Sequence, residues 1–77
     1  MFDLLVMETA GSDVKSEAIG WSRFRGKREI IGGYCPASVV DAMGTGWRLL
    51  GPPTPASDGN SNWYMERVSP VDGDADA

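Results

Sequence analysis

The stretch PASVVDAMGTGWRLL, residues 36–50, decides the fold that we expect for this chain. Pro36 suits the first position of a helix, because proline lacks the N–H that would have no helical partner there. Gly44 stands where a left-handed residue commonly ends a helix. The stretch therefore predicts a helix from Pro36 to Met43, with Asp41 turned outward. Two turns are too short to be stable alone in water, so a sheet must cover the apolar face formed by Pro36, Val39, Val40 and Met43.

Two elements are predicted on the C-terminal side of this helix. Trp47 to Leu50 has the apolar content of a short strand, which stops at Gly51-Pro52-Pro53. The segment 51–62 contains three prolines and many small polar residues, which predicts a loop that is long for a hairpin connection. Trp63 to Val68 alternates strong strand formers and is the last predicted strand.

The N-terminal part of the chain also predicts strands. Phe2 to Glu8 alternates in the manner of a strand with one buried face, and a cluster of turn formers at 9–13 ends it. Segments 19–24 and 29–34 have aromatic and β-branched residues and flank Arg25-Gly26-Lys27-Arg28, which predicts a hairpin. A competing interpretation makes Ser16 to Phe24 a short helix capped by Ser16, although Gly20 and Trp21 favour the strand.

These elements together predict an α+β fold. We expect a small sheet of three to five mainly antiparallel strands with one short helix packed on one face, leaving the opposite face or an edge exposed. The chain has 77 residues, which suffices for one domain, placed here at residues 1–70. Residues 71–77 include three Asp and no large apolar residue after Val71, so we expect a disordered acidic tail.

Composition excludes several classes of function. Seven Lys and Arg against eleven Asp and Glu give a net charge of −4, the wrong overall sign for a protein that coats nucleic acid. The absence of His removes imidazole bases and ligands, and the single Cys35 leaves no internal disulfide or thiolate zinc site. We therefore expect a chain that is not an enzyme and uses no cofactor or metal.

The sequence also bears on location. No apolar run approaches the roughly 20 residues that cross a bilayer. Residues 1–10 contain two acids and no base, unlike a secretory signal, and one cysteine suits a reducing compartment. The prediction is a cytoplasmic protein without membrane contact.

Basic residues are concentrated in one place. Four of the seven lie within six positions, at Arg23, Arg25, Lys27 and Arg28. Trp21, Phe24 and Tyr34 flank them, and bases beside aromatic rings can hold phosphates and stack on nucleobases, or contact a protein. A solvated hairpin tip explains the same pattern, and the acidic remainder of the chain disfavours nucleic acid.

The aromatic residues are the second candidate feature. Three Trp exceed what one small core comfortably buries, so some aromatic side chains should face solvent. We expect Trp47 and Trp63 in the core, and Trp21 and Tyr64 as surface anchors for a partner. An uncapped edge strand would favour strand addition by a partner or by a second copy of the chain.

Three further patterns suggest no site. Asp72, Asp74 and Asp76 alternate as at the start of a calcium loop, but the glycine and the final acid of that loop are missing. Cys35 lies at the predicted helix start but has no His partner, so a structural role is expected. The glycines at 32, 33, 44 and 46 match no phosphate loop and predict tight turns.

The run MGTGWRLL, residues 43–50, followed by WYMER, residues 63–67, resembles small bacterial and phage domains of unknown function. Their pattern is a short helix, a Gly-Trp-x-Leu strand, a variable loop, and a Tyr-rich closing strand that ends near a basic residue. The resemblance covers about half the chain and implies a compact α+β fold with Trp47 between helix and sheet. It brings no catalytic residues, and this chain differs in its shorter helix and extra hairpin.

The functional expectation is a non-catalytic protein-binding module. By analogy with the small acidic domains of phages and mobile elements, it would inhibit or modulate a host protein, such as a defence or regulatory complex. Its expected contact residues are Trp21, Arg23, Arg25, Lys27, Arg28 and Tyr64. The alternatives are a small nucleic-acid-associated regulatory factor using the tip at Arg23 to Arg28, and a homo-oligomeric structural protein that pairs through edge strands.

Overall fold

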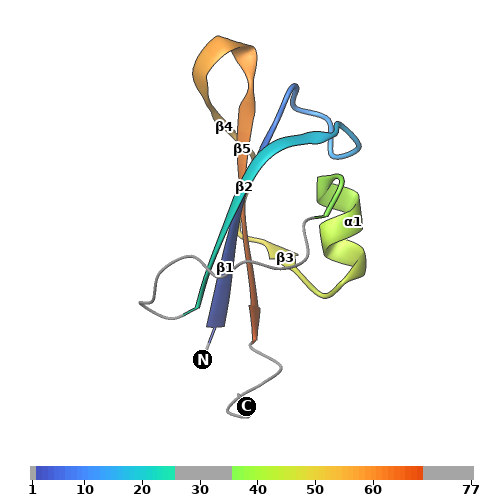
Figure 1. The fold of residues 1–77 in the computed structure, drawn as a ribbon, viewed down its shortest axis with the longest axis vertical. Helices are drawn as coiled ribbons and strands as arrows, with labels where there is room; N and C mark the ends of the chain where they lie inside the picture. The colour runs from blue at the N-terminus through green and yellow to red at the C-terminus, as the bar shows by residue number, and fades with distance from the viewer. Residues whose placement is uncertain (1, 26–35, 69–77) are drawn as a thin grey trace.

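The computed structural model describes residues 2–25 and 36–68, which form a small antiparallel sheet and one short α-helix (Figure 1). The α+β fold is thus confirmed, with five strands in the described part of the chain. In chain order the elements are β1 (Phe2–Thr9), β2 (Ala18–Arg25), α1 (Val39–Gly44), β3 (Arg48–Leu49), β4 (Thr54–Pro55), the 3-10 turn η1 (Ser57–Gly59) and β5 (Ser61–Val68).

The two long strands β1 and β5 form the centre of the sheet. The strand order is β2-β1-β5-β3, and β4 pairs with the start of β5. All pairs are antiparallel, and Val6 of β1 lies opposite Ser22 on one side and Tyr64 on the other. The predicted strands at 2–8, 19–24 and 63–68 are confirmed, each extended by one or two residues. The helix considered for Ser16 to Phe24 is wrong, because this segment pairs with β1 as a strand.

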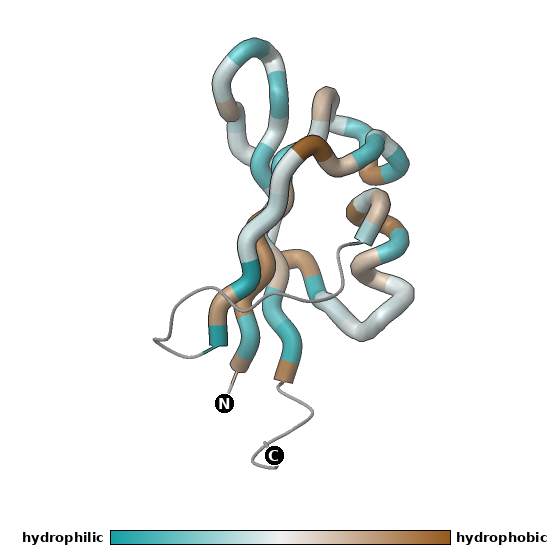
Figure 2. The backbone as a smooth tube through the Cα atoms, viewed as in Figure 1, coloured by the Kyte–Doolittle hydropathy of each residue, from teal (hydrophilic) through white to brown (hydrophobic). Residues whose placement is uncertain are grey.

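The segment 51–62 is more ordered than the loop that we predicted. Thr54 and Pro55 pair with Asn62 and Ser61, so a tight hairpin joins β4 to β5. Proline is tolerated there because β4 lies at the edge of the sheet. Asp58 and Gly59 have positive φ angles of 59° and 77°, which reverse the chain. This hairpin extends beyond the helix in Figure 1 and is mostly hydrophilic in Figure 2.

The core contains alternate residues of the central strands. Leu5 and Met7 of β1 are buried with Trp63 and Met65 of β5. Trp47 completes this group between α1 and β3, and Val39 and Ala42 of α1 belong to the same cluster. The predicted burial of Trp47 and Trp63 is confirmed.

The helix begins and ends later than predicted. Ser38 is its N-cap, and the Ser38 hydroxyl accepts a hydrogen bond from the Asp41 N–H at 3.4 Å. Pro36 is buried outside the helix, since the Ala18 N–H donates to the Ala37 carbonyl at 2.8 Å and Ser38 bridges to the chain before β2. These contacts hold residues 37 and 38 beside β2, so the helix starts only at Val39.

The end of the helix also uses a different glycine. Gly44 is the last helical residue, and Gly46, with φ of 99°, takes the left-handed conformation that we expected at Gly44. The buried face of the helix also differs from the predicted one. Val39 and Ala42 are buried, whereas Val40 and Met43 are 40% and 36% exposed. The predicted apolar face is therefore correct only at Pro36 and Val39.

Several predictions lie outside the described residues. These are the second strand of the hairpin at 29–34, the glycine turn at 26–28, and the tail at 71–77. Within the ranges 2–25 and 36–68, the structure has no helix of the length and apolarity required to cross a membrane.

Candidate functional site

The sheet has two faces with different chemistry. Asp3, Leu5, Met7 and Thr9 of β1 are buried, so the residues between them project from the opposite face. We call this opposite face the open face. It comprises Phe2, Leu4, Val6 and Glu8 of β1, Gly20, Ser22 and Phe24 of β2, Asn62, Tyr64, Glu66 and Val68 of β5, and Arg48 of β3.

The middle and one end of the open face are apolar. Tyr64 lies opposite Val6, and its side chain is 39% exposed. Phe2 and Val68 lie opposite each other at the end of the sheet and are 55% and 65% exposed. The half-buried Leu4 lies between these two pairs on β1, and Glu66 occupies the facing position on β5. The result is an apolar stripe along β1, widened by Tyr64 and Val68 and interrupted on β5 by Glu66; exposed apolar surface of this kind marks interaction sites.

A hollow of about 130 Å³ interrupts the open face beside this stripe. Its lining residues are Val6, Glu8, Gly20, Trp21, Ser22 and Asn62. The hollow exists because Gly20, which has no side chain, lies opposite Glu8 in the β1–β2 pairing. A Cβ atom added to Gly20 would lie 3.9 Å from Glu8 Oε1 and within 4 Å of no other non-neighbouring atom.

Two groups of polar and charged side chains lie on or beside the open face. The Asn60 side chain donates to Glu8 Oε2 at 2.9 Å, which fixes the Glu8 carboxylate at the edge of the hollow. Arg48 of β3 forms an ion pair with Glu66 of β5. The Arg48 side chain is largely exposed, so this pair contributes little to stability and leaves the guanidinium accessible.

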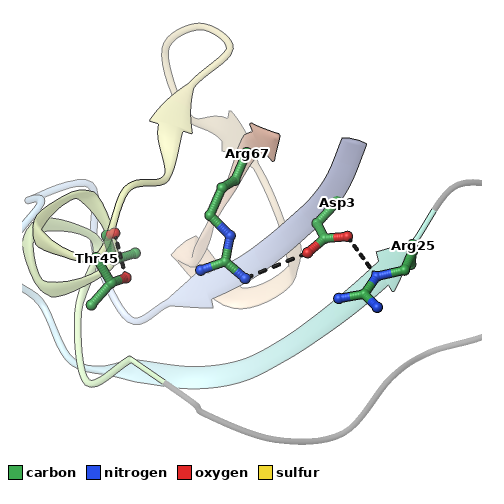
Figure 3. A network of polar contacts seen from close by, with 5 residues as sticks. Asp3, Arg25, Thr45 and Arg67 are labelled. Atoms are coloured by element: carbon green, nitrogen blue, oxygen red, sulfur yellow. Dashed lines mark hydrogen bonds and ion pairs between the residues drawn. The ribbon is translucent and has the colours of Figure 1, made fainter. Parts of the chain in front are cut away.

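The other face carries an ionic cluster across three strands (Figure 3). The fully buried Asp3 carboxylate accepts from Arg25 Nε at 3.0 Å and from Arg67 at 3.4 Å. The Arg67 guanidinium also stacks over the Trp47 ring, 4.2 Å from its centroid. We call Asp3, Arg25 and Arg67 the Asp3 triad, and it joins β2, β1 and β5 in one row.

The structure separates the basic residues that the sequence grouped. Arg23 and Arg25 lie on β2 opposite Leu5 and Asp3, on the core side of the sheet. Arg25 is half-buried in its ion pair with Asp3, so it is not a solvated tip residue. Lys27 and Arg28 lie outside the described residues.

Asp3 and Arg67 were not identified as partners of Arg25 from the sequence. The signal for Asp3 was its position in the same alternating row as the apolar Leu5 and Met7. A carboxylate in a buried row requires a cationic partner, but the sequence alone does not say which arginine supplies it.

The two predicted anchors lie on different faces. Tyr64 is on the open face, whereas Trp21 lies opposite Met7, is half-buried and packs against the core cluster. Trp21 also lines the hollow, although it is not one of the residues that make up the open face. The structure therefore brings Tyr64 together with Val6 and Phe2, and not with the arginines.

Comparison with known proteins gives no relative for this chain. No family model matches it, no curated protein matches it, and no solved structure matches it. In the part of the chain that the structure describes, no group of three Asp, Glu or Cys side chains is close enough to hold a metal ion.

Proposed function

We propose that this protein is a non-catalytic protein-binding module and that the open face is its binding surface. The proposal rests on Tyr64, an exposed aromatic residue at the middle of the central strand β5. Tyrosine gives a large contact area and a hydrogen-bonding hydroxyl for the loss of only two side-chain torsions. Tyr64 lies on β5, which pairs with neighbouring strands on both sides, so a fixed backbone carries its ring.

The rigidity of the surroundings supports this choice. Val6 and Leu4 project from β1, which pairs with β2 and β5 along its length. The backbone of such a sheet loses little freedom when a partner binds, because its strands are already paired, so the ordering cost is confined to the side chains. We further infer that α1 covers only the other face, since its buried residues Val39 and Ala42 join the core cluster.

The charges on the open face indicate the chemistry of the partner. Glu8 lies on this face next to Val6, Glu66 lies within it opposite Leu4 and pairs with Arg48, and the whole chain has a net charge of −4. A partner with apolar residues and a basic residue placed to meet Glu8 would complement this surface. A second copy of the chain would match the apolar stripe but would bring its own net negative charge to the interface.

The test replaces Tyr64 by the photo-crosslinking residue p-benzoylphenylalanine in the full chain, expressed in the cells that encode it. The matched control places the same residue at Val40, which is equally exposed but lies on α1. We expect a discrete adduct from position 64 and none from position 40. Excess unlabelled wild-type chain should compete for this adduct, and the Tyr64→Asp variant should not.

The mass of the adduct identifies the type of partner. An adduct of twice the chain mass would assign the open face to a homo-oligomer and not to a separate protein. Equal crosslinking from positions 64 and 40, or no adduct from position 64, would contradict the proposal. Urea unfolding of Tyr64→Asp verifies that the variant still folds, as an exposed position should allow.

A further inference from the structure

We propose that the hollow on the open face receives a basic side chain, arginine or lysine, from the partner. This inference rests on the proposed function, because it names the chemistry that the partner inserts beside the apolar stripe. The hollow is lined by Val6, Glu8, Gly20, Trp21, Ser22 and Asn62 and has a volume of about 130 Å³.

The carboxylate of Glu8 is the chemical centre of the hollow. Its Oε2 atom accepts a hydrogen bond from Asn60, which holds the carboxylate in place. Within the described residues no side chain donates to Oε1, and Glu8 forms no ion pair there. The pairing of β1 with β2 places this oxygen beside Gly20, at the side of the hollow. One oxygen of the Glu8 carboxylate therefore has a hydrogen-bond donor, while the other can accept a hydrogen bond from a partner.

The other polar lining groups also suit a hydrogen-bond donor. Ser22 and Asn62 present a hydroxyl and an amide, each of which has an oxygen that accepts hydrogen bonds. No described basic side chain lines the hollow, so its formal charge is that of Glu8. A cation that donates several hydrogen bonds satisfies this set better than a neutral donor, because it adds the attraction between opposite charges to the hydrogen bonds with the Glu8 carboxylate.

The size of the hollow suits the end of a long side chain. Its volume of about 130 Å³ has room for a group of several heavy atoms. The guanidinium or ammonium end of a side chain fits this volume, and its methylene stem would lie against Val6 and Tyr64, which face each other at the edge of the stripe. An aromatic or branched partner residue would instead contact the stripe itself.

A metal ion is a poorer occupant of the same hollow. Calcium takes about six to eight oxygen ligands and usually several carboxylates. Here only Glu8 carries a charge, and one of its oxygens already accepts from Asn60.

Gly20 offers a direct test, because one methyl group would partly fill the hollow without a clash. A Cβ atom at this position meets only Glu8 Oε1, at the ordinary contact distance of 3.9 Å, and the φ of Gly20 is not in the left-handed region. Gly20→Ala should therefore fold normally and reduce binding of the cation. Gly51→Ala is the matched control, since a Cβ at Gly51 meets nothing within 4 Å.

The probe is N-acetyl-arginine methylamide, titrated into the full ¹⁵N-labelled chain and followed by NMR. N-acetyl-citrulline methylamide, which has the same shape and no charge, is the control ligand. We expect saturable shifts at the amides of Gly20, Ser22 and Asn62, with citrulline binding about fivefold more weakly. Glu8→Gln and Gly20→Ala should each weaken arginine binding by about fivefold, and Gly51→Ala should leave it unchanged.

Equal binding of arginine and citrulline would overturn the inference, as would shifts confined to residues outside the hollow. Retained arginine binding by Glu8→Gln would also overturn it. This result is separable from the proposed function, which is read from the adduct at position 64. A specific adduct with no arginine binding would leave the open face as the binding surface and reject the hollow as a basic-residue pocket.

Discussion

Replacing Asp3 by Asn tests the energetic role of the Asp3 triad. The Asp3 carboxylate is fully buried and accepts from Arg25 at 3.0 Å and from Arg67 at 3.4 Å. Removing its charge leaves two guanidinium groups in a partly dry environment, with only one carbonyl oxygen between them. The loss of one partner from a buried ion pair costs about 3–5 kcal/mol.

The structure lowers this figure. The side chains of Arg25 and Arg67 remain 27% and 22% exposed, so water can solvate part of each freed charge. We therefore expect Asp3→Asn to lower the free energy of unfolding by about 2–4 kcal/mol. A chain of 77 residues has a total stability of roughly 4–12 kcal/mol, so the variant loses a large fraction of it.

The assay is urea unfolding followed by the fluorescence of the buried Trp47 and Trp63. Small domains lose about 1 kcal/mol per molar urea, so the midpoint should fall by about 2 M or more. Asp41→Asn removes the same charge from an exposed position in the first turn of α1, where the lost interaction with the helix N-terminus should cost no more than about 1 kcal/mol. If the two variants unfold at the same urea concentration, the triad does not stabilise the sheet and this reasoning is refuted.

Three further substitutions, one of them with a matched control, test local contacts by urea unfolding, which in Trp63→Phe is followed by the remaining tryptophans. Trp63→Phe removes the hydrogen bond that Nε1 donates to Thr9 Oγ1 at 2.8 Å and leaves the buried Thr9 hydroxyl without this donor. The free energy of unfolding should fall by about 1–3 kcal/mol, and an unchanged midpoint would contradict the role of this bond. Gly46→Ala forces a side chain onto a φ of 99° and should destabilise by about 1 kcal/mol or more, whereas Gly44→Ala, in the helix, should be neutral or stabilising. Ser38→Ala removes the helix N-cap and should lower the free energy of unfolding by about 1 kcal/mol. An unchanged midpoint would show that the 3.4 Å contact does not stabilise the helix.

The long strands could be predicted from the sequence because the alternation of residues along a strand is visible within a few neighbouring positions. Alternation over 63–68 and the β-forming residues around Trp21 are properties of neighbouring residues, and the strands formed where expected. Alternation did not tell which face of β1 is buried, since Leu4 and Val6 are as apolar as Leu5 and Met7. That choice depends on what each face meets in three dimensions, and the buried Asp3 with its two arginines is part of the answer.

The helix boundaries and the site were less predictable for a related reason. Pro36 is a good first helical residue by local rules, but the bridge from Glu17 to Ser38 keeps the chain extended past it. Both Gly44 and Gly46 can take a left-handed conformation, but Gly44 is the last helical residue and Gly46 has the positive φ. The hollow depends on Gly20 lying opposite Glu8, a register that no single segment specifies.

The central claim is that the open face binds a partner through Tyr64. The most direct measurement is the dissociation constant of the purified partner for three chains: wild type, Tyr64→Ala and Met43→Ala. Tyr64 and Met43 are almost equally exposed, at 39% and 36%, but lie on β5 and α1. We predict that Tyr64→Ala weakens binding by about tenfold or more, while Met43→Ala stays within about twofold of wild type. Equal affinities for Tyr64→Ala and wild type would contradict the account.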